Sequence, residues 1–147
     1  MSAPAWRKLG RILDPDVHGL SGATYATLPV PVLLDDRVRV IYSARDSEGR
    51  SFGTWFDFRP DAPDEILNVA VAPSITSGRP GFFDDAGAMP STAWWHGEIL
   101  KLLYIGWNLS VSVPFRHAIG LAYSTDGGQT FEKQFDGPVM DRSPVDP

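Results

Sequence analysis

The chain of 147 residues is long enough for one ordinary domain, and its apolar content of 43% can supply a core. Its formal net charge of −5 and its lack of a basic run argue against nucleic acid as a partner. The absence of cysteine excludes disulfides, thiolate metal sites and a cysteine nucleophile. Because the sequence also shows no zinc-ligand spacing and no phosphate-binding loop, we expect neither a metal nor another cofactor.

The N-terminus gives no targeting signal. Its first ten residues include Arg7 and Lys8 but no apolar run, which does not fit a signal peptide. Elsewhere, no apolar run approaches the length that spans a membrane. We therefore expect a cytoplasmic protein without a membrane partner.

The apolar segments indicate short strands separated by turns. In chain order, the predicted strands cover residues 6–13, 30–34, 38–44, 54–58, 66–71, 91–95, 99–106 and 117–123. Aromatic residues, which favour strands, make up 12% of the chain, and 14 glycines with 13 prolines supply the turns. Apolar residues at helical spacing are nearly absent. The predicted fold class is therefore all-β.

One strand pattern occurs twice. The matching positions are Pro29 and Pro90, 61 apart, Tyr42 and Tyr104, 62 apart, and Gly53 and Gly120, 67 apart. A repeat of three or four strands at this spacing is typical of a propeller blade. We predict a first blade at 24–72, a second at 84–136 and the start of a third at 138–147. Because two blades cannot close a ring, the pattern indicates a fragment of a longer protein.

Residues 124–131 read Ser-Thr-Asp-Gly-Gly-Gln-Thr-Phe, which fits the Asp-box pattern of propeller hairpins. We expect Asp126 to accept hydrogen bonds from the turn amides, a glycine to take the positive φ, and Phe131 to pack inside the blade. Such a segment predicts a structural role away from any active site.

Two acidic residues precede the predicted innermost strand of the second blade. Innermost strands line the central channel of a propeller, so Asp84 or Asp85 could reach a ligand there. Glycoside hydrolysis needs paired carboxylates, and both residues are candidate catalytic groups. The alternative is a solvated turn, and the sequence does not distinguish the two aspartates.

Further candidates for substrate binding stand at strand ends and strand entries. They are Arg45, Asp46, Trp107, Asn108, Arg116, His117 and Arg142. Arg can bind hydroxyls or a carboxylate, and Trp can stack on the face of a sugar. Three alternatives stay open: an ion pair that closes the turn at Asp46, a structural role for His117, and a simple chain end around Arg142.

Together these stretches resemble the five-bladed propeller glycosidases of the arabinanase, levansucrase and invertase superfamily, and more closely a glycosidase-like branch of it. The resemblance rests on residues 37–46 (R-V-R-V-I-Y-S-A-R-D), 83–91, 104–108, 114–122 and 141–144. It covers nearly the whole sequence, but only about the first half of such a protein.

The resemblance implies three carboxylates at the channel: a base or nucleophile on blade one, an Asp on blade two and a Glu acid on blade three. The blade-two position matches Asp84 or Asp85, and the blade-three Glu would lie beyond residue 147. The innermost strand of blade one, 24–34, has no acid, and Asp14, Asp16 and Asp46 match that position imperfectly.

We therefore expect a glycoside hydrolase-like propeller that acts on or binds a carbohydrate and is inactive as this chain alone. The alternative is a non-catalytic carbohydrate-binding or interaction module. Either could self-associate through exposed blade edges.

Overall fold

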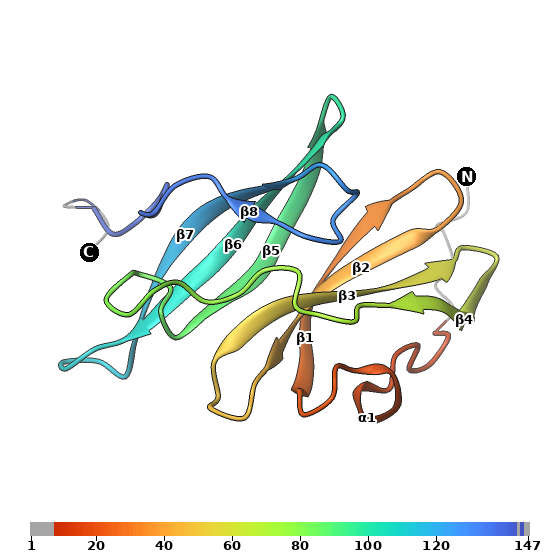
Figure 1. The fold of residues 1–147 in the computed structure, drawn as a ribbon, viewed down its shortest axis with the longest axis horizontal. Helices are drawn as coiled ribbons and strands as arrows, with labels where there is room; N and C mark the ends of the chain where they lie inside the picture. The colour runs from red at the N-terminus through yellow and green to blue at the C-terminus, as the bar shows by residue number, and fades with distance from the viewer. Residues whose placement is uncertain (1–7, 144, 146–147) are drawn as a thin grey trace, which may run out of the picture.

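The computed structural model describes residues 8–143 and residue 145, and this part is almost entirely β-structure (Figure 1). The elements in chain order are α1 (Pro15–His18), β1 (Thr24–Leu33), β2 (Val38–Arg45), β3 (Ser51–Arg59), β4 (Ala62–Val69), β5 (Gly87–His96), β6 (Ile99–Leu109), β7 (Phe115–Ser124) and β8 (Glu132–Lys133). The predicted all-β fold class is confirmed.

The predicted strand at 6–13 is not present where it can be judged. Residues 8–13 form no strand, and residues 6 and 7 lie outside the described part. The short helix α1 follows, because Asp14 accepts a hydrogen bond from the N–H of Asp16 at 3.1 Å and Pro15 fits the first helical position. Among the described residues, no helix has the length and apolar character needed to cross a membrane.

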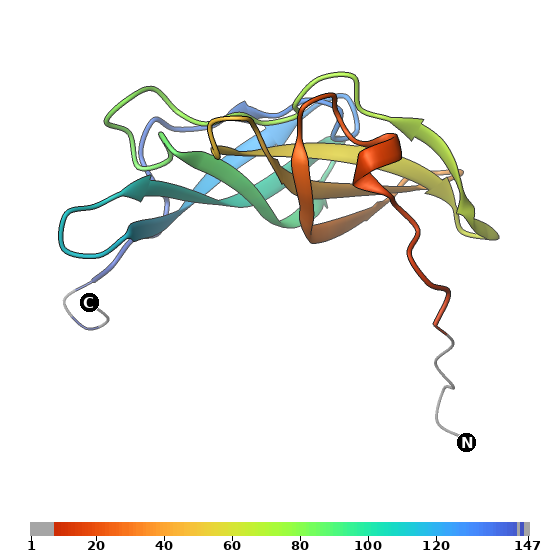
Figure 2. The same cartoon turned by 90° about the horizontal axis from the view of Figure 1, so that it is seen from below.

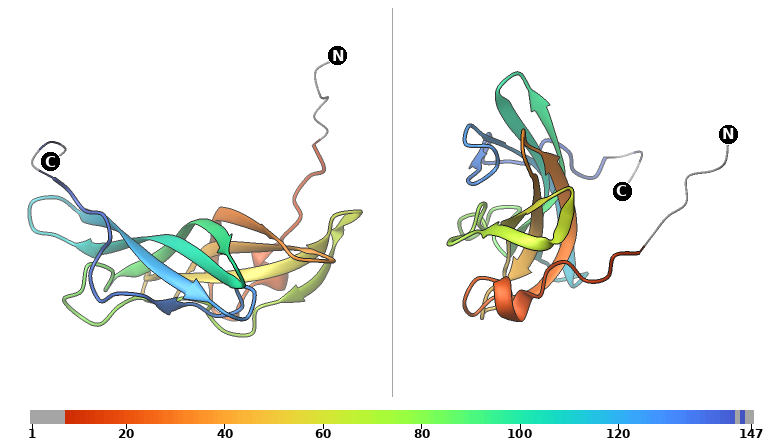
Figure 3. Two further views of the ribbon diagram at one scale, coloured as in Figure 1. Left: turned by 90° about the horizontal axis from the view of Figure 1, so that it is seen from above. Right: turned by 90° about the vertical axis from the view of Figure 1, so that its right-hand side faces the viewer.

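The strands form two four-stranded antiparallel units. We call β1–β4 the first blade and β5–β8 the second, each with its strands paired in chain order. A single parallel bridge between Ser51 and Gly87 connects β3 to β5. Figure 3 shows the two blades following one another along the long axis of the molecule.

Strand register corrects one position of the sequence repeat. Tyr42 in β2 pairs with Thr54, whereas Tyr104 in β6 pairs with Gly120. The structural counterpart of Gly120 is therefore Thr54 and not Gly53. Gly120 lies beneath the Tyr104 ring, since a Cβ atom built there would come within 2.1 Å of the ring carbon Cζ.

The main core lies between the two blades. Its buried residues are Val30, Val32, Ile41, Trp55, Ala70, Ile75, Ala88, Leu100, Leu102, Tyr104, Ala122 and Phe131. A second cluster covers the other face of the first blade, where Tyr42 and Phe56 pack with Ile12, Leu13 and Leu20 from the N-terminal segment. Each blade thus turns its central tyrosine, Tyr42 or Tyr104, toward the segment that precedes it.

Residues 70–86 connect the blades. This segment crosses in front of the sheets in Figure 1 and runs along one side of the molecule in Figure 2. The N–H of Ser74 donates to the carbonyl of Gly53 at 2.7 Å, and the carbonyl of Ser74 accepts from the N–H of Phe131 at 2.8 Å. The segment is therefore hydrogen-bonded to both blades.

The turn at 124–131 is closed by its own side chains and docked on the first blade. The carboxylate of Asp126 accepts from the N–H groups of Gln129 and Thr130 at 2.9 and 3.0 Å, and Gly127 and Gly128 have φ values of 73° and 87°. Arg39 Nη1 donates to the carbonyl of Gly127 at 3.1 Å, and Trp55 Nε1 donates to that of Gln129 at 3.1 Å.

Candidate functional site

A hollow of about 180 Å³ collects several of the candidate residues from both blades. It is lined by Arg45, Met89, Trp107, Phe115 and His117, and we call it the Trp107 hollow. Arg45 ends β2, Met89 lies near the start of β5, and the other three belong to β6 and β7. Cross-strand pairing of Trp107 with His117 sets these two side chains on one face of the sheet.

Aromatic rings form most of this hollow. The Trp107 and Phe115 rings meet edge to face with centroids 5.7 Å apart, and Phe115 stacks on the His117 ring at 6.3 Å. The Arg45 guanidinium lies 5.5 Å from the centre of the exposed Tyr25 ring. Flat apolar faces beside a guanidinium and an imidazole can hold a ligand that has both C–H faces and hydroxyls.

The indole N–H of Trp107 is buried and has no hydrogen-bond partner among the described residues. It lies against Gly87, where a Cβ atom would approach Nε1 to 2.3 Å. An unpaired buried donor costs about 1–3 kcal/mol, so this group favours an added acceptor such as a ligand oxygen or a water molecule.

A second hollow of about 180 Å³ lies at the other face of the same strands. Asn108, Arg116 and Asp141 line it, with Gly81, Phe83, His117 and Ala118. Asn108 pairs with Arg116, one position from the Trp107–His117 pair, and side chains of successive residues alternate between faces. Arg116 Nη2 lies 3.9 Å from the Asp141 carboxylate. The candidates Trp107 and Asn108 therefore serve different hollows.

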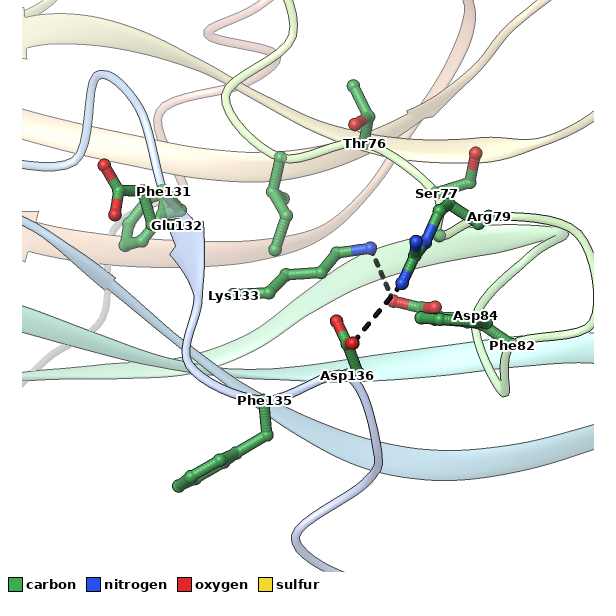
Figure 4. Close-up of a pocket in the computed structure, with 12 residues that line it drawn as sticks. Thr76, Ser77, Arg79, Phe82, Asp84, Phe131, Glu132, Lys133, Phe135 and Asp136 are labelled. Atoms are coloured by element: carbon green, nitrogen blue, oxygen red, sulfur yellow. Dashed lines mark hydrogen bonds and ion pairs between the residues drawn. The ribbon is translucent and has the colours of Figure 1, made fainter.

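Asp84 is buried, with 1% of its surface exposed, and makes two side-chain contacts. Its Oδ2 accepts from the Tyr104 hydroxyl at 3.0 Å and pairs with Lys133 Nζ at 2.6 Å (Figure 4). Its Oδ1 has no partner among the described residues. Burial and the adjacent Asp84 carboxylate raise the pKa of Tyr104 above its usual range, so the hydroxyl remains a donor.

Asp84 also lines a cavity of about 360 Å³ between residues 75–82 and 131–136, which we call the Asp84 cavity. Figure 4 shows Lys133 and Asp136 approaching it from the β8 side, opposite Arg79 and Asp84. Its lining shares no residue with the Trp107 hollow.

Asp85 and Asp46 both close turns. Asp85 Oδ2 accepts from the N–H of Gly81 at 2.8 Å. Asp46 Oδ1 accepts from the N–H of Arg50 at 2.8 Å, and Asp46 Oδ2 accepts from Arg50 Nε at 3.2 Å. Its slight burial would raise the pKa of Asp46, but its hydrogen bonds with Arg50 and Glu48 outweigh this and lower it.

Arg142 is exposed, and its backbone N–H donates to the Asp141 carboxylate at 2.7 Å. In the described part of the sequence, no group of three or more His, Asp or Glu side chains could hold a metal ion.

Sequence reasoning missed several residues of these hollows. Tyr25, Phe115 and Lys133 stood in segments without a recognised motif, although Phe115 directly precedes the candidate Arg116. Asp141 lay beside Arg142, and its place opposite Arg116 depends on the bridge between Ile119 and Met140. A strand alignment at residue level would have been needed to find it.

No family model matches the sequence. The chain is 35% identical over 144 residues to two proteins of Mycobacterium tuberculosis, "Uncharacterized protein Rv1502" (strain ATCC 25618 / H37Rv) and "Uncharacterized protein MT1551" (strain CDC 1551 / Oshkosh). The match covers 97% of this chain and 48% of each of those proteins. The chain spans about half the length of the curated relatives it matches.

Three solved structures are similar in fold. A complex of BT0996 with RGII matches with a TM-score of 0.55 at 15% identity and 82% of this chain. A protein of Parabacteroides distasonis ATCC 8503 with a provisional glycoside hydrolase assignment matches with 0.57 at 18%, and one named "Glycoside hydrolase" with 0.56 at 14%. The match covers 39%, 34% and 38% of these three proteins. The fold of this chain is glycosidase-like.

Proposed function

We propose that this chain is the carbohydrate-binding half of a glycoside hydrolase-like propeller. The observation that supports it best is the Trp107 hollow, in which aromatic rings, the Arg45 guanidinium and the His117 imidazole line one small concave site. This site lies on a fold similar to that of glycoside hydrolases.

The chemistry of the hollow suits a neutral sugar. The rings of Trp107 and Phe115 can cover the C–H face of a sugar, while Arg45 donates to its oxygens and His117 donates or accepts. A sugar oxygen that reached the buried indole N–H of Trp107 would satisfy a donor that otherwise has no partner among the described residues.

We assign binding to this chain and hydrolysis to a longer protein that contains it. Both glycosidase mechanisms need two carboxyl groups, about 5–5.5 Å apart for retention or 6.5–9.5 Å apart for inversion. Asp84 is paired with Lys133, and Asp85 caps the turn at Gly81. The Trp107 hollow has no carboxylate among its described lining residues.

The test is a glycan array followed by calorimetry on the 147-residue protein. The panel includes RGII fragments, because one structural neighbour is described as an RGII complex. Arg45→Ala and Phe115→Ala should each weaken binding at least tenfold. Trp94→Ala, an exposed tryptophan outside the hollow, is the matched control and should bind as the wild type does. Equal affinity in all four proteins contradicts the proposal.

A further inference from the structure

We propose that the Asp84 cavity is a second ligand site and that it takes one small, neutral, hydroxyl-rich molecule such as a monosaccharide. Its volume of about 360 Å³ lies near the lower end of the range for ligand pockets, about 300–1,000 Å³, so it fits a single small ligand. The site is separate from the Trp107 hollow and does not depend on it.

The first observation is an unsatisfied acceptor. Asp84 is more than nine-tenths buried, yet its Oδ1 has no donor among the described residues. Oδ2, by contrast, takes both Tyr104 and Lys133. A buried carboxylate oxygen without a donor is costly, and a ligand hydroxyl is a donor of the right kind.

The second observation is the balance of charge around the cavity. Each charged lining residue already has a partner: Asp84 with Lys133, Arg79 with Asp136 at 3.3 Å, and Glu132 with the Tyr123 hydroxyl at 2.5 Å. An ionic ligand would meet like charge beside every counter-charge. A hydroxyl both donates and accepts, so a neutral polyol can contact these groups without breaking the pairs.

The third observation is the apolar part of the wall. Phe82 and Phe135 both line the cavity, and Phe135 is 51% exposed. The Arg79 guanidinium lies 4.5 Å above the Phe82 ring, so one side of the cavity combines a flat apolar face with donors. A sugar presents the matching combination, a C–H face bordered by hydroxyls.

The experiment is a site-resolved NMR titration of the ¹⁵N-labelled protein with glucose, galactose and arabinose. Glucuronic acid and glucosamine are the charged comparisons. Binding in the cavity shifts the backbone amides of Gly78 and Lys133, whereas binding in the Trp107 hollow shifts the Trp107 indole N–H and the Gly87 amide. The two proposals are therefore separated within one spectrum.

Phe135→Ala is the decisive variant, because its exposed ring can be removed without loss of the core. We expect it to weaken neutral-sugar binding at Gly78 and Lys133 at least tenfold and to leave the Trp107 signals unchanged. Phe115→Ala is the matched control in the other hollow and should leave the cavity signals unchanged. The proposal is overturned by no shift at Gly78 and Lys133, by stronger binding of the charged sugars, or by unaltered affinity in Phe135→Ala.

Discussion

Arg39 binds the carboxylate of Asp57 with two parallel hydrogen bonds inside the first blade. Arg39 Nε to Oδ1 and Arg39 Nη2 to Oδ2 both measure 2.8 Å, and both side chains are almost fully buried. The guanidinium also lies 3.9 Å from the centre of the Trp55 ring. One side chain thus joins β2 to β3 and, through the carbonyl of Gly127, to the second blade.

Asp57→Ala should strongly destabilise the protein, because it leaves the Arg39 charge buried without its carboxylate. Breaking a buried pair costs about 3–5 kcal/mol. Arg39→Lys should also destabilise, since an ammonium cannot make the paired contact. Urea unfolding followed by tryptophan fluorescence measures both, with Asp61→Ala at the exposed Arg59–Asp61 pair as control. Similar midpoints for Asp57→Ala and Asp61→Ala would contradict this account.

Lys133→Met should destabilise through Asp84. The substitution removes the ammonium from a carboxylate that is 1% exposed, at a cost of roughly 3 kcal/mol. Adding Asp84→Asn should recover part of this loss, because a neutral amide does not need the charge. Thermal unfolding of the two single variants and the double variant forms a complete cycle. Strictly additive losses would show that the pair is not coupled.

Gly120→Ala should lower stability by about 1–3 kcal/mol through overpacking against Tyr104. In the Tyr104→Leu background the same change should cost much less, because the ring is gone. Gly137→Ala is a suitable control, since a Cβ atom there has no neighbour within 4 Å among the described residues. An equal cost of Gly120→Ala in both backgrounds would rule out the ring contact as its cause.

The turn at Asp126 should make stability depend on acid. Partial burial would raise the pKa of Asp126, but hydrogen bonds from Thr130, Ser124 and Gln129 outweigh this and lower it. A lowered pKa gives stability that is complete above the ordinary value of about 3.9 and is lost as the pH falls through the folded-state value. Asp126→Asn should therefore be less stable than the wild type at neutral pH.

Chemical unfolding at a series of pH values checks this prediction. The difference between wild type and Asp126→Asn should shrink steadily below about pH 4, as the wild-type carboxyl takes up its proton. A difference that stays constant down to about pH 2 would exclude the carboxylate as its source.

We also expect the protein to self-associate. Trp94 and Trp95 on β5 are each 43% exposed and Leu33 on β1 is 75% exposed, and β4 leaves one strand edge unpaired among the described residues. Sedimentation velocity over a concentration series should show species larger than a monomer, and Trp94→Lys should reduce them. A concentration-independent monomer would count against this expectation.

The sequence predicted the strands well because each is a short apolar run bounded by turn residues. Predicted 38–44 and 99–106 lie within β2 and β6. It predicted less about the site, since the side of a strand on which a residue lies depends on register. The bulge between Pro90 and Thr92 and the shifts along β1 illustrate this, and no local pattern marks them.

The candidate aspartates show the same limit. Alternation along the sequence indicated that Asp84 and Asp85 point in different directions, and they do: Asp84 contacts Tyr104, while Asp85 caps Gly81. Which one is buried depends on Lys133, 49 positions away in the sequence. Such a partner is set by tertiary packing and leaves no signal near the aspartates.

The docking of the 124–131 turn has a consequence for how substitutions are tolerated. Arg39 and Trp55 donate from their side chains, but the groups that accept are the main-chain carbonyls of Gly127 and Gln129. Every amino acid carries such a carbonyl, so replacing Gln129 retains the acceptor as long as the turn keeps its shape. Replacing Trp55 or Arg39 removes the donor altogether. Across homologous proteins, variation should therefore be common at position 129 and rare at positions 39 and 55.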